Sequence, residues 1–163
     1  MLHGPDQFRE ELKRLLSAQS EHAQQLIGTL EAERDALADG DAEALDSLTG
    51  RKSTLLQGLE DIALEQQDLI DGLALEDGDR GLETALAWCD PASELKATRQ
   101  TVGKNLQRCR ELNDRNGLTV QYRMGYVRRA LNVLNGDSAG DSGIYGRDGR
   151  TTGNVHSRLL ASG

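Results

Sequence analysis

The chain has 163 residues, a formal net charge of −8, 37% hydrophobic and 28% charged residues, and a length that suits one domain. Only five residues are aromatic and two are proline. A thick core built on aromatic side chains is therefore excluded, whereas narrow aliphatic seams between long helices are favoured. We predict an all-α fold in which long antiparallel helices form an elongated, coiled-coil-like bundle over residues 1–136, followed by a flexible C-terminal tail.

The charges are distributed unevenly along the chain. Residues 1–90 hold 7 Lys or Arg and 21 Asp or Glu, whereas residues 91–136 hold 9 and 3. Because opposite charges attract, we expect the basic segment to pack along the acidic one. This interpretation, and the lack of aromatic stacking platforms, argue against nucleic acid as a partner. The basic residues expected to make contacts within the chain are Arg99, Lys104, Arg108 and Arg115.

The first two predicted helices span residues 6–38 and 42–73. In each, seam positions recur every three or four residues, the spacing of one helix face. Asp6 is the expected N-cap of the first helix and Gly40 its end, because glycine readily adopts the left-handed conformation found there. Asp41 is the expected N-cap of the second helix. A connection this short predicts an antiparallel helical hairpin.

The predicted third helix is short and spans residues 80–88, and the fourth spans 91–136. Asp90 is expected to cap the fourth helix, with Pro91 at its first position, where proline is tolerated. Its seam positions are spaced close to the 3.5-residue repeat of a coiled coil. We expect any bend in this helix to fall between Asn113 and Gly117, since glycine weakens a helix.

The last 27 residues, 137–163, have a different composition. Gly, Ser, Asp, Thr and Arg surround an isolated Ile144-Tyr145 pair, and no core can be built from them, so we expect disorder in the free protein. A weak final turn is expected at residues 155–161. Tyrosine offers contact area and a hydroxyl at a small entropic cost. We interpret Tyr145 as the centre of a short linear docking motif.

No catalytic or metal-binding pattern is found in the sequence. The three histidines lie in different segments, and there is neither a metal-binding Cys/His cluster nor a nucleophile motif. We therefore predict no enzymatic activity, no catalytic residue, no metal and no cofactor. Cys89 and Cys109 are expected to be free thiols of a reduced cytoplasmic protein. No apolar run reaches membrane-spanning length, so membrane insertion is not expected.

Polar residues at seam positions of the fourth helix allow two interpretations. Asn113 and Asn116 either set the register of the helix against its neighbours or belong to a seam that is only half covered. A half-covered seam with an adaptable methionine would accept an amphipathic helix from another protein. The residues predicted to form that binding surface are Asn113, Asn116, Val120, Met124, Val127, Leu131 and Leu134.

Together these features resemble the FlgN family of flagellar export chaperones, across essentially the whole chain. The resemblance rests on an acidic helical hairpin containing residues 52–56 (KSTLL), on a long helix with Asn113 and Asn116 followed by aliphatic residues, and on residues 145–149 (YGRDG) in the tail. Residues 150–163 match no pattern that we recognise.

The resemblance implies a cytoplasmic chaperone without enzymatic activity. Family members bind the C-terminal helical ends of hook–filament junction proteins, prevent their premature assembly, and deliver them to the flagellar type III export gate. The fourth helix would bind the client, and the tail residues Tyr145, Gly146 and Gly149 would dock on the gate. The alternative is a generic coiled-coil adaptor or a protein that dimerises through its own long helix.

Overall fold

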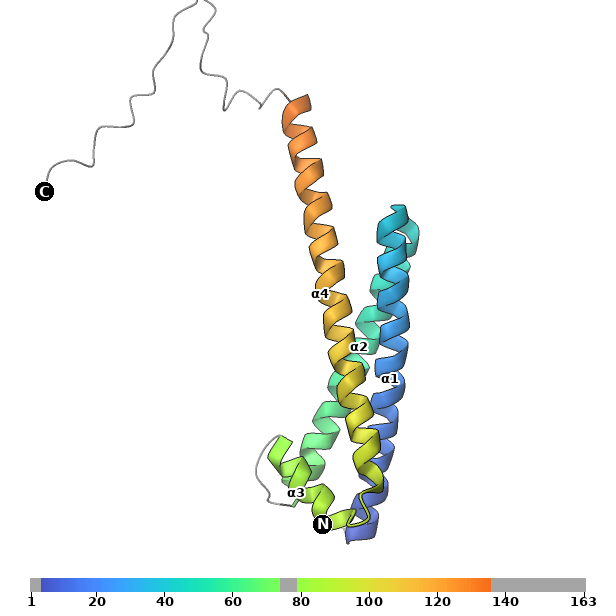
Figure 1. Cartoon of the computed structure of the whole chain (residues 1–163), viewed down its shortest axis with the longest axis vertical. Helices are drawn as coiled ribbons and strands as arrows, with labels where there is room; N and C mark the ends of the chain where they lie inside the picture. Colours follow the sequence, from blue (N-terminus) through green and yellow to red (C-terminus); the bar gives the residue numbers. More distant parts are fainter. Residues whose placement is uncertain (1–3, 74–78, 136–163) are drawn as a thin grey trace, which may run out of the picture. The chain divides into compact units, whose positions relative to one another are not determined.

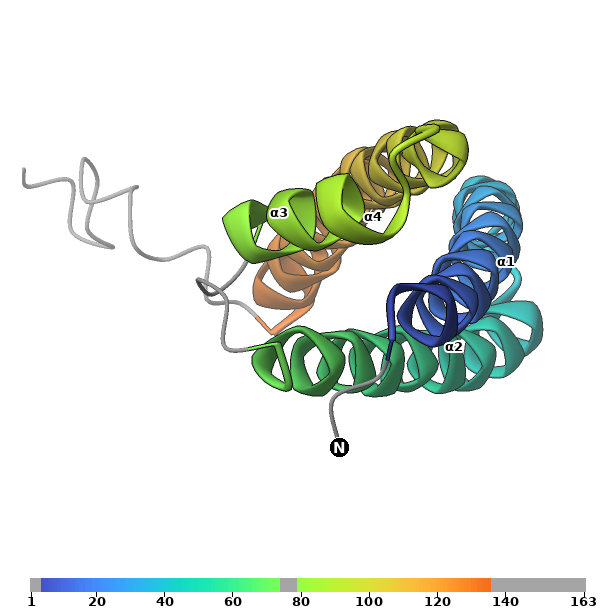
Figure 2. The same cartoon turned by 90° about the horizontal axis from the view of Figure 1, so that it is seen from below.

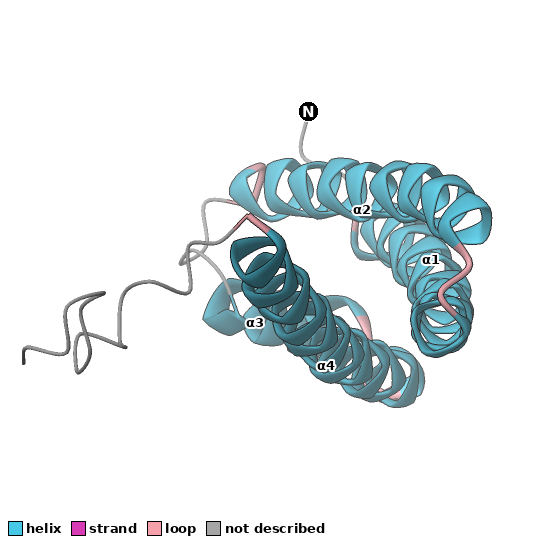
Figure 3. Ribbon diagram, turned by 90° about the horizontal axis from the view of Figure 1, so that it is seen from above, coloured by secondary structure: helices cyan, strands magenta, loops and turns pink. Residues whose placement is uncertain are grey.

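The computed structural model describes residues 4–73 and 79–135, and these residues form four helices (Figure 1). The helices are α1 (Pro5–Asp39), α2 (Ala42–Asp71), α3 (Asp79–Cys89) and α4 (Glu94–Leu134). Only helices and their connections occur in the described residues (Figure 3). The prediction of an all-α helical bundle is therefore confirmed. The tail, including residues 137–163, lies outside the described residues.

The turn between α1 and α2 forms as its sequence predicts. Gly40 ends α1 with a φ of 71°, and its N–H donates to the carbonyl of Ala36. The Asp41 carboxylate then accepts a hydrogen bond from the N–H of Ala44 at 3.0 Å, which satisfies a donor at the start of α2. The two long helices consequently run antiparallel, side by side (Figures 1 and 2).

Two predicted helix starts are wrong. Gly4, not Asp6, is the N-cap of α1; Pro5 takes the first helical position, and Asp6 lies in the first turn. At the fourth helix, the N–H of Asp90 still donates to Leu86 of the preceding helix at 2.8 Å. Pro91 therefore falls in a turn, and α4 begins only at Glu94. Asp90 nevertheless contributes to this start, because its carboxylate accepts from the N–H of Leu95 at 2.7 Å.

The chain divides into two compact units, Met1–Thr119 and Val120–Gly163. The first contains α1, α2, α3 and the beginning of α4, with two clusters of buried side chains. One cluster gathers residues of all four helices, and within it Phe8 meets Trp88 edge to face at 5.7 Å. The other joins α1, α2 and α4. The residues of this second cluster are Leu26, Leu30, Leu55, Cys109 and Leu112.

Ion pairs join the basic fourth helix to the acidic helices within the first unit. Arg99 contacts Glu83 of α3 at 3.4 Å, and Arg108 lies 3.7 Å from Glu31 of α1. The predicted contacts with acidic residues are therefore seen for two of the four basic residues. Within the described ranges, no ion pair is seen for Lys104 or Arg115. Since exposed ion pairs contribute little stability, the buried clusters must supply most of the packing energy.

Candidate protein-binding surface of α4

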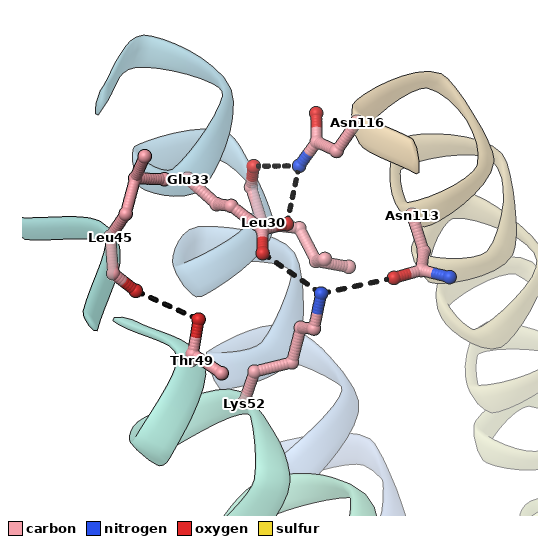
Figure 4. A network of polar contacts seen from close by, with 7 residues as sticks. All are labelled: Leu30, Glu33, Leu45, Thr49, Lys52, Asn113 and Asn116. Carbon is pink, nitrogen blue, oxygen red and sulfur yellow. Dashed lines mark hydrogen bonds and ion pairs between the residues drawn. The ribbon is translucent and has the colours of Figure 1, made fainter. Parts of the chain in front are cut away.

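A cluster of four polar side chains, here called the polar cluster, joins α1, α2 and α4 (Figure 4). The Lys52 ammonium donates to the Glu33 carboxylate at 2.8 Å and to the Asn113 side-chain oxygen at 3.2 Å. The Asn116 amide donates to the other Glu33 oxygen at 2.7 Å and to the backbone carbonyl of Leu30 at 2.9 Å. Each helix thus contributes at least one member.

Two members of the polar cluster are buried, so the loss of their contacts would be costly. Glu33 is only 8% exposed and Asn116 only 3%. A buried carboxylate requires compensation, which Lys52 and Asn116 supply together. If α4 slid along α1, Glu33 would lose the amide of Asn116, so the polar cluster favours one register of α4 on the hairpin. Asn113 is the exposed member of the cluster.

The predicted binding residues consequently fall into two environments. Asn116 is committed to contacts within the first unit, as the register interpretation expects, and direct client binding by it stays a prediction. The five apolar residues, in contrast, are exposed on α4. These five, here called the first stripe, are Val120, Met124, Val127, Leu131 and Leu134.

The structure also shows exposed apolar side chains on α4 that the sequence reasoning missed. Tyr122, Tyr126 and Val133 are 78%, 70% and 66% exposed, respectively, and we call them the second stripe. They lie off the seam pattern, which is why a search for one stripe passed over them. Counting apolar residues on every face of the helix, instead of only on its seam, would have found them.

The predicted docking residues Tyr145, Gly146 and Gly149 lie outside the described residues. Their role in contacting an export gate therefore stays a prediction. The same holds for residues 150–163 and for the turn expected at residues 155–161.

A hollow of about 1020 Å³ lies between α1 and α2 and is lined by several carboxylates and Arg14. Arg14 is held at 2.7 Å by both Glu11 and Glu65, and these hydrogen bonds raise the pKa of its guanidinium. Among the described residues, no three His, Cys, Asp or Glu side chains converge in a way that could hold a metal ion.

Two further features complete this part of the chain. Cys89 and Cys109 are free, buried thiols in separate clusters, and burial raises the pKa of both. Neither is placed as an activated nucleophile, which would need a lowered pKa. None of the described helices is both long enough and apolar enough to cross a membrane.

The family model FlgN, described as FlgN protein, matches residues 1–153. The chain belongs to the FlgN family. FlgN proteins are flagellar export chaperones, so the match places this chain in a class of binding proteins. The resemblance seen in the sequence is thereby confirmed. No curated protein and no solved structure matches the chain.

Proposed function

We propose that this FlgN-family chaperone binds the C-terminal helical ends of hook–filament junction proteins in the cytoplasm and delivers them to the flagellar type III export gate. The observation that carries the proposal is the first stripe. It exposes five apolar side chains on α4, in a chain that belongs to a family of export chaperones. Contiguous exposed apolar surface of this kind marks interaction sites.

The physical role of such binding follows from the client's chemistry. A segment that assembles through helices has an apolar face of its own, which would associate prematurely if it were left free. A client helix lying along the first stripe would hide both apolar faces at once. Delivery requires release, so we expect a moderate affinity and a one-to-one complex.

The rival function, a self-associating adaptor, uses the same surface and predicts a different assembly. Sedimentation of the full chain, alone and with a C-terminal fragment of a junction protein from the same organism, separates the two. We expect the free chain to be replaced by a one-to-one complex. A stable dimer that persists when the fragment is added would overturn the chaperone proposal.

Docking on the export gate is proposed for the tail and has a separate test. Tyr145→Ala should leave binding of the junction-protein fragment unchanged and should weaken capture of the chain by the purified cytoplasmic part of the export gate. Retained capture would show that Tyr145 is not the docking residue. Loss of the helical circular dichroism signal would show instead that this tyrosine supports the bundle.

A further inference from the structure

The second stripe lies on a different side of α4 from the first stripe. A helix turns by about 100° per residue, so Tyr122 and Met124, two positions apart, point in directions about 160° apart. Tyr126 and Val133 follow Tyr122 after four and eleven residues, spacings that return to nearly the same side of the helix. The described part of the second unit is therefore a helix with apolar side chains on two nearly opposite faces.

A single partner helix cannot cover both faces. An amphipathic helix buries one stripe against its neighbour, whereas a helix that is apolar on all sides is found surrounded by others. Both tyrosines and Val133 would remain in water if a client covered the first stripe alone. A second helix packed on these three side chains would remove them from water.

The charge of this segment indicates the chemistry of those helices. Residues 120–135 contain three arginines and no Asp or Glu. On a helical projection Arg128 borders the first stripe and Arg129 borders the second. Helices that pack on these stripes would be favoured by carboxylates on the flanks of their apolar faces.

We propose that α4 is clasped between two acidic amphipathic helices of one client, the first helix on the first stripe and the second on the second stripe. This inference rests on the proposed function and deepens it, since it specifies a client with two helices in place of one. It also assigns binding roles to Tyr122, Tyr126 and Arg129.

Photo-crosslinking distinguishes the two faces. The photoreactive amino acid benzoylphenylalanine replaces either Met124 or Tyr122 in the full chain, the C-terminal fragment of a junction protein is added, and the crosslinked peptides are mapped by mass spectrometry. We expect both positions to crosslink the fragment, in two separate segments of its sequence. The two positions are close in sequence, so a difference between them reports the face and not the location along α4.

Each other outcome has a defined meaning. Crosslinking from Met124 alone, or from both positions to one segment, would overturn the two-helix clasp and leave the proposed function standing. Crosslinking from Tyr122 to a second copy of the chain would assign the second stripe to self-association and also overturn the clasp. Failure at both positions would contradict the proposed function itself.

Affinity measurements add a second, independent readout. The double variant Tyr122→Ser, Tyr126→Ser should weaken binding of the fragment at least about tenfold, as loss of buried tyrosine contacts does. Gln121→Ser with Asn132→Ser is the matched control, since these positions lie between the stripes, and it should bind normally. Equal affinity of the two double variants would refute a role for the second stripe.

Substitutions of Arg129 test whether the client is acidic. Arg129→Glu should slow association with the fragment and reduce its dependence on salt, because electrostatic steering acts mainly on the association rate. Arg129→Gln should show a smaller change in the same direction. An unchanged association rate in both variants would show that carboxylates do not face Arg129.

Discussion

At the scale of single residues, the buried Glu33 carboxylate depends most strongly on keeping its partner Lys52. Removing Lys52 while keeping this carboxylate leaves a charge without its cation, which costs more than the pair itself contributes. We expect Lys52→Met to lower the free energy of unfolding by about 2 kcal/mol. Urea denaturation followed by circular dichroism measures the change.

The matched control removes both charges. Glu33→Met with Lys52→Met should recover most of the stability lost in Lys52→Met, because no buried charge then lacks a partner. A double variant no more stable than Lys52→Met would mean that the unpaired Glu33 carboxylate carries no penalty, contrary to this expectation.

A second requirement arises where α1 and α2 approach closely. A Cβ atom at Gly58 would lie 2.7 Å from the His22 ring, which is fixed by a 2.9 Å contact between its Nδ1 and the carbonyl of Ala18. We expect Gly58→Ala to destabilise the bundle by about 1–2 kcal/mol, since overpacking displaces the ring. Thermal or urea unfolding provides the measurement.

Gly50 supplies the control on the same helix. A Cβ there meets nothing within 4 Å, so Gly50→Ala should stabilise α2 by about 0.5–1 kcal/mol through the ordinary helix preference of alanine. If both substitutions stabilised the protein equally, the contact between His22 and Gly58 would not limit the packing of the two helices.

At the scale of helices, local sequence was enough where one residue decides the backbone. Gly40 and Asp41 were predicted correctly because a left-handed glycine and a capping carboxylate act within a few residues. The predicted start of the fourth helix at Pro91 was wrong, because the N–H of Asp90 still donates to the carbonyl of Leu86. That competition between two helix ends cannot be read from the composition of either one.

The two parts of α4 should differ in stability, since Cys109 and Leu112 are buried whereas the stripes are exposed. We expect amide exchange to be slow around these two residues and fast over residues 120–134 in the free protein, because local opening is easier where few side chains are buried. Adding the junction-protein fragment should slow exchange over residues 120–134. Hydrogen-exchange mass spectrometry gives both profiles.

Gly125→Ala calibrates this measurement. The added methyl group meets no neighbour and should slow exchange over residues 120–134 without any client, by favouring the helix. Equally slow exchange along the whole of α4 in the free wild-type chain would contradict the expected difference between its parts.

At the scale of the whole molecule, the sequence predicted the helices better than the contacts between them. The helical hairpin and the long fourth helix were accessible from spacing and charge, whereas the family was found by resemblance to its hairpin, long helix and tail. The polar cluster was not predicted, although Asn113 and Asn116 were placed at seam positions of the fourth helix. Bringing the members of the cluster together required the relative register of three helices, which depends on packing across the bundle.

The central claim is that the first stripe binds the helical end of a junction protein. Isothermal titration calorimetry of the full chain with the C-terminal fragment tests it most directly, using the double variant Val120→Asp, Val127→Asp. Both residues are exposed, so the variant should keep its fold by circular dichroism. We predict that it loses detectable binding while the wild type binds one to one; an unchanged affinity in the folded variant would contradict the claim.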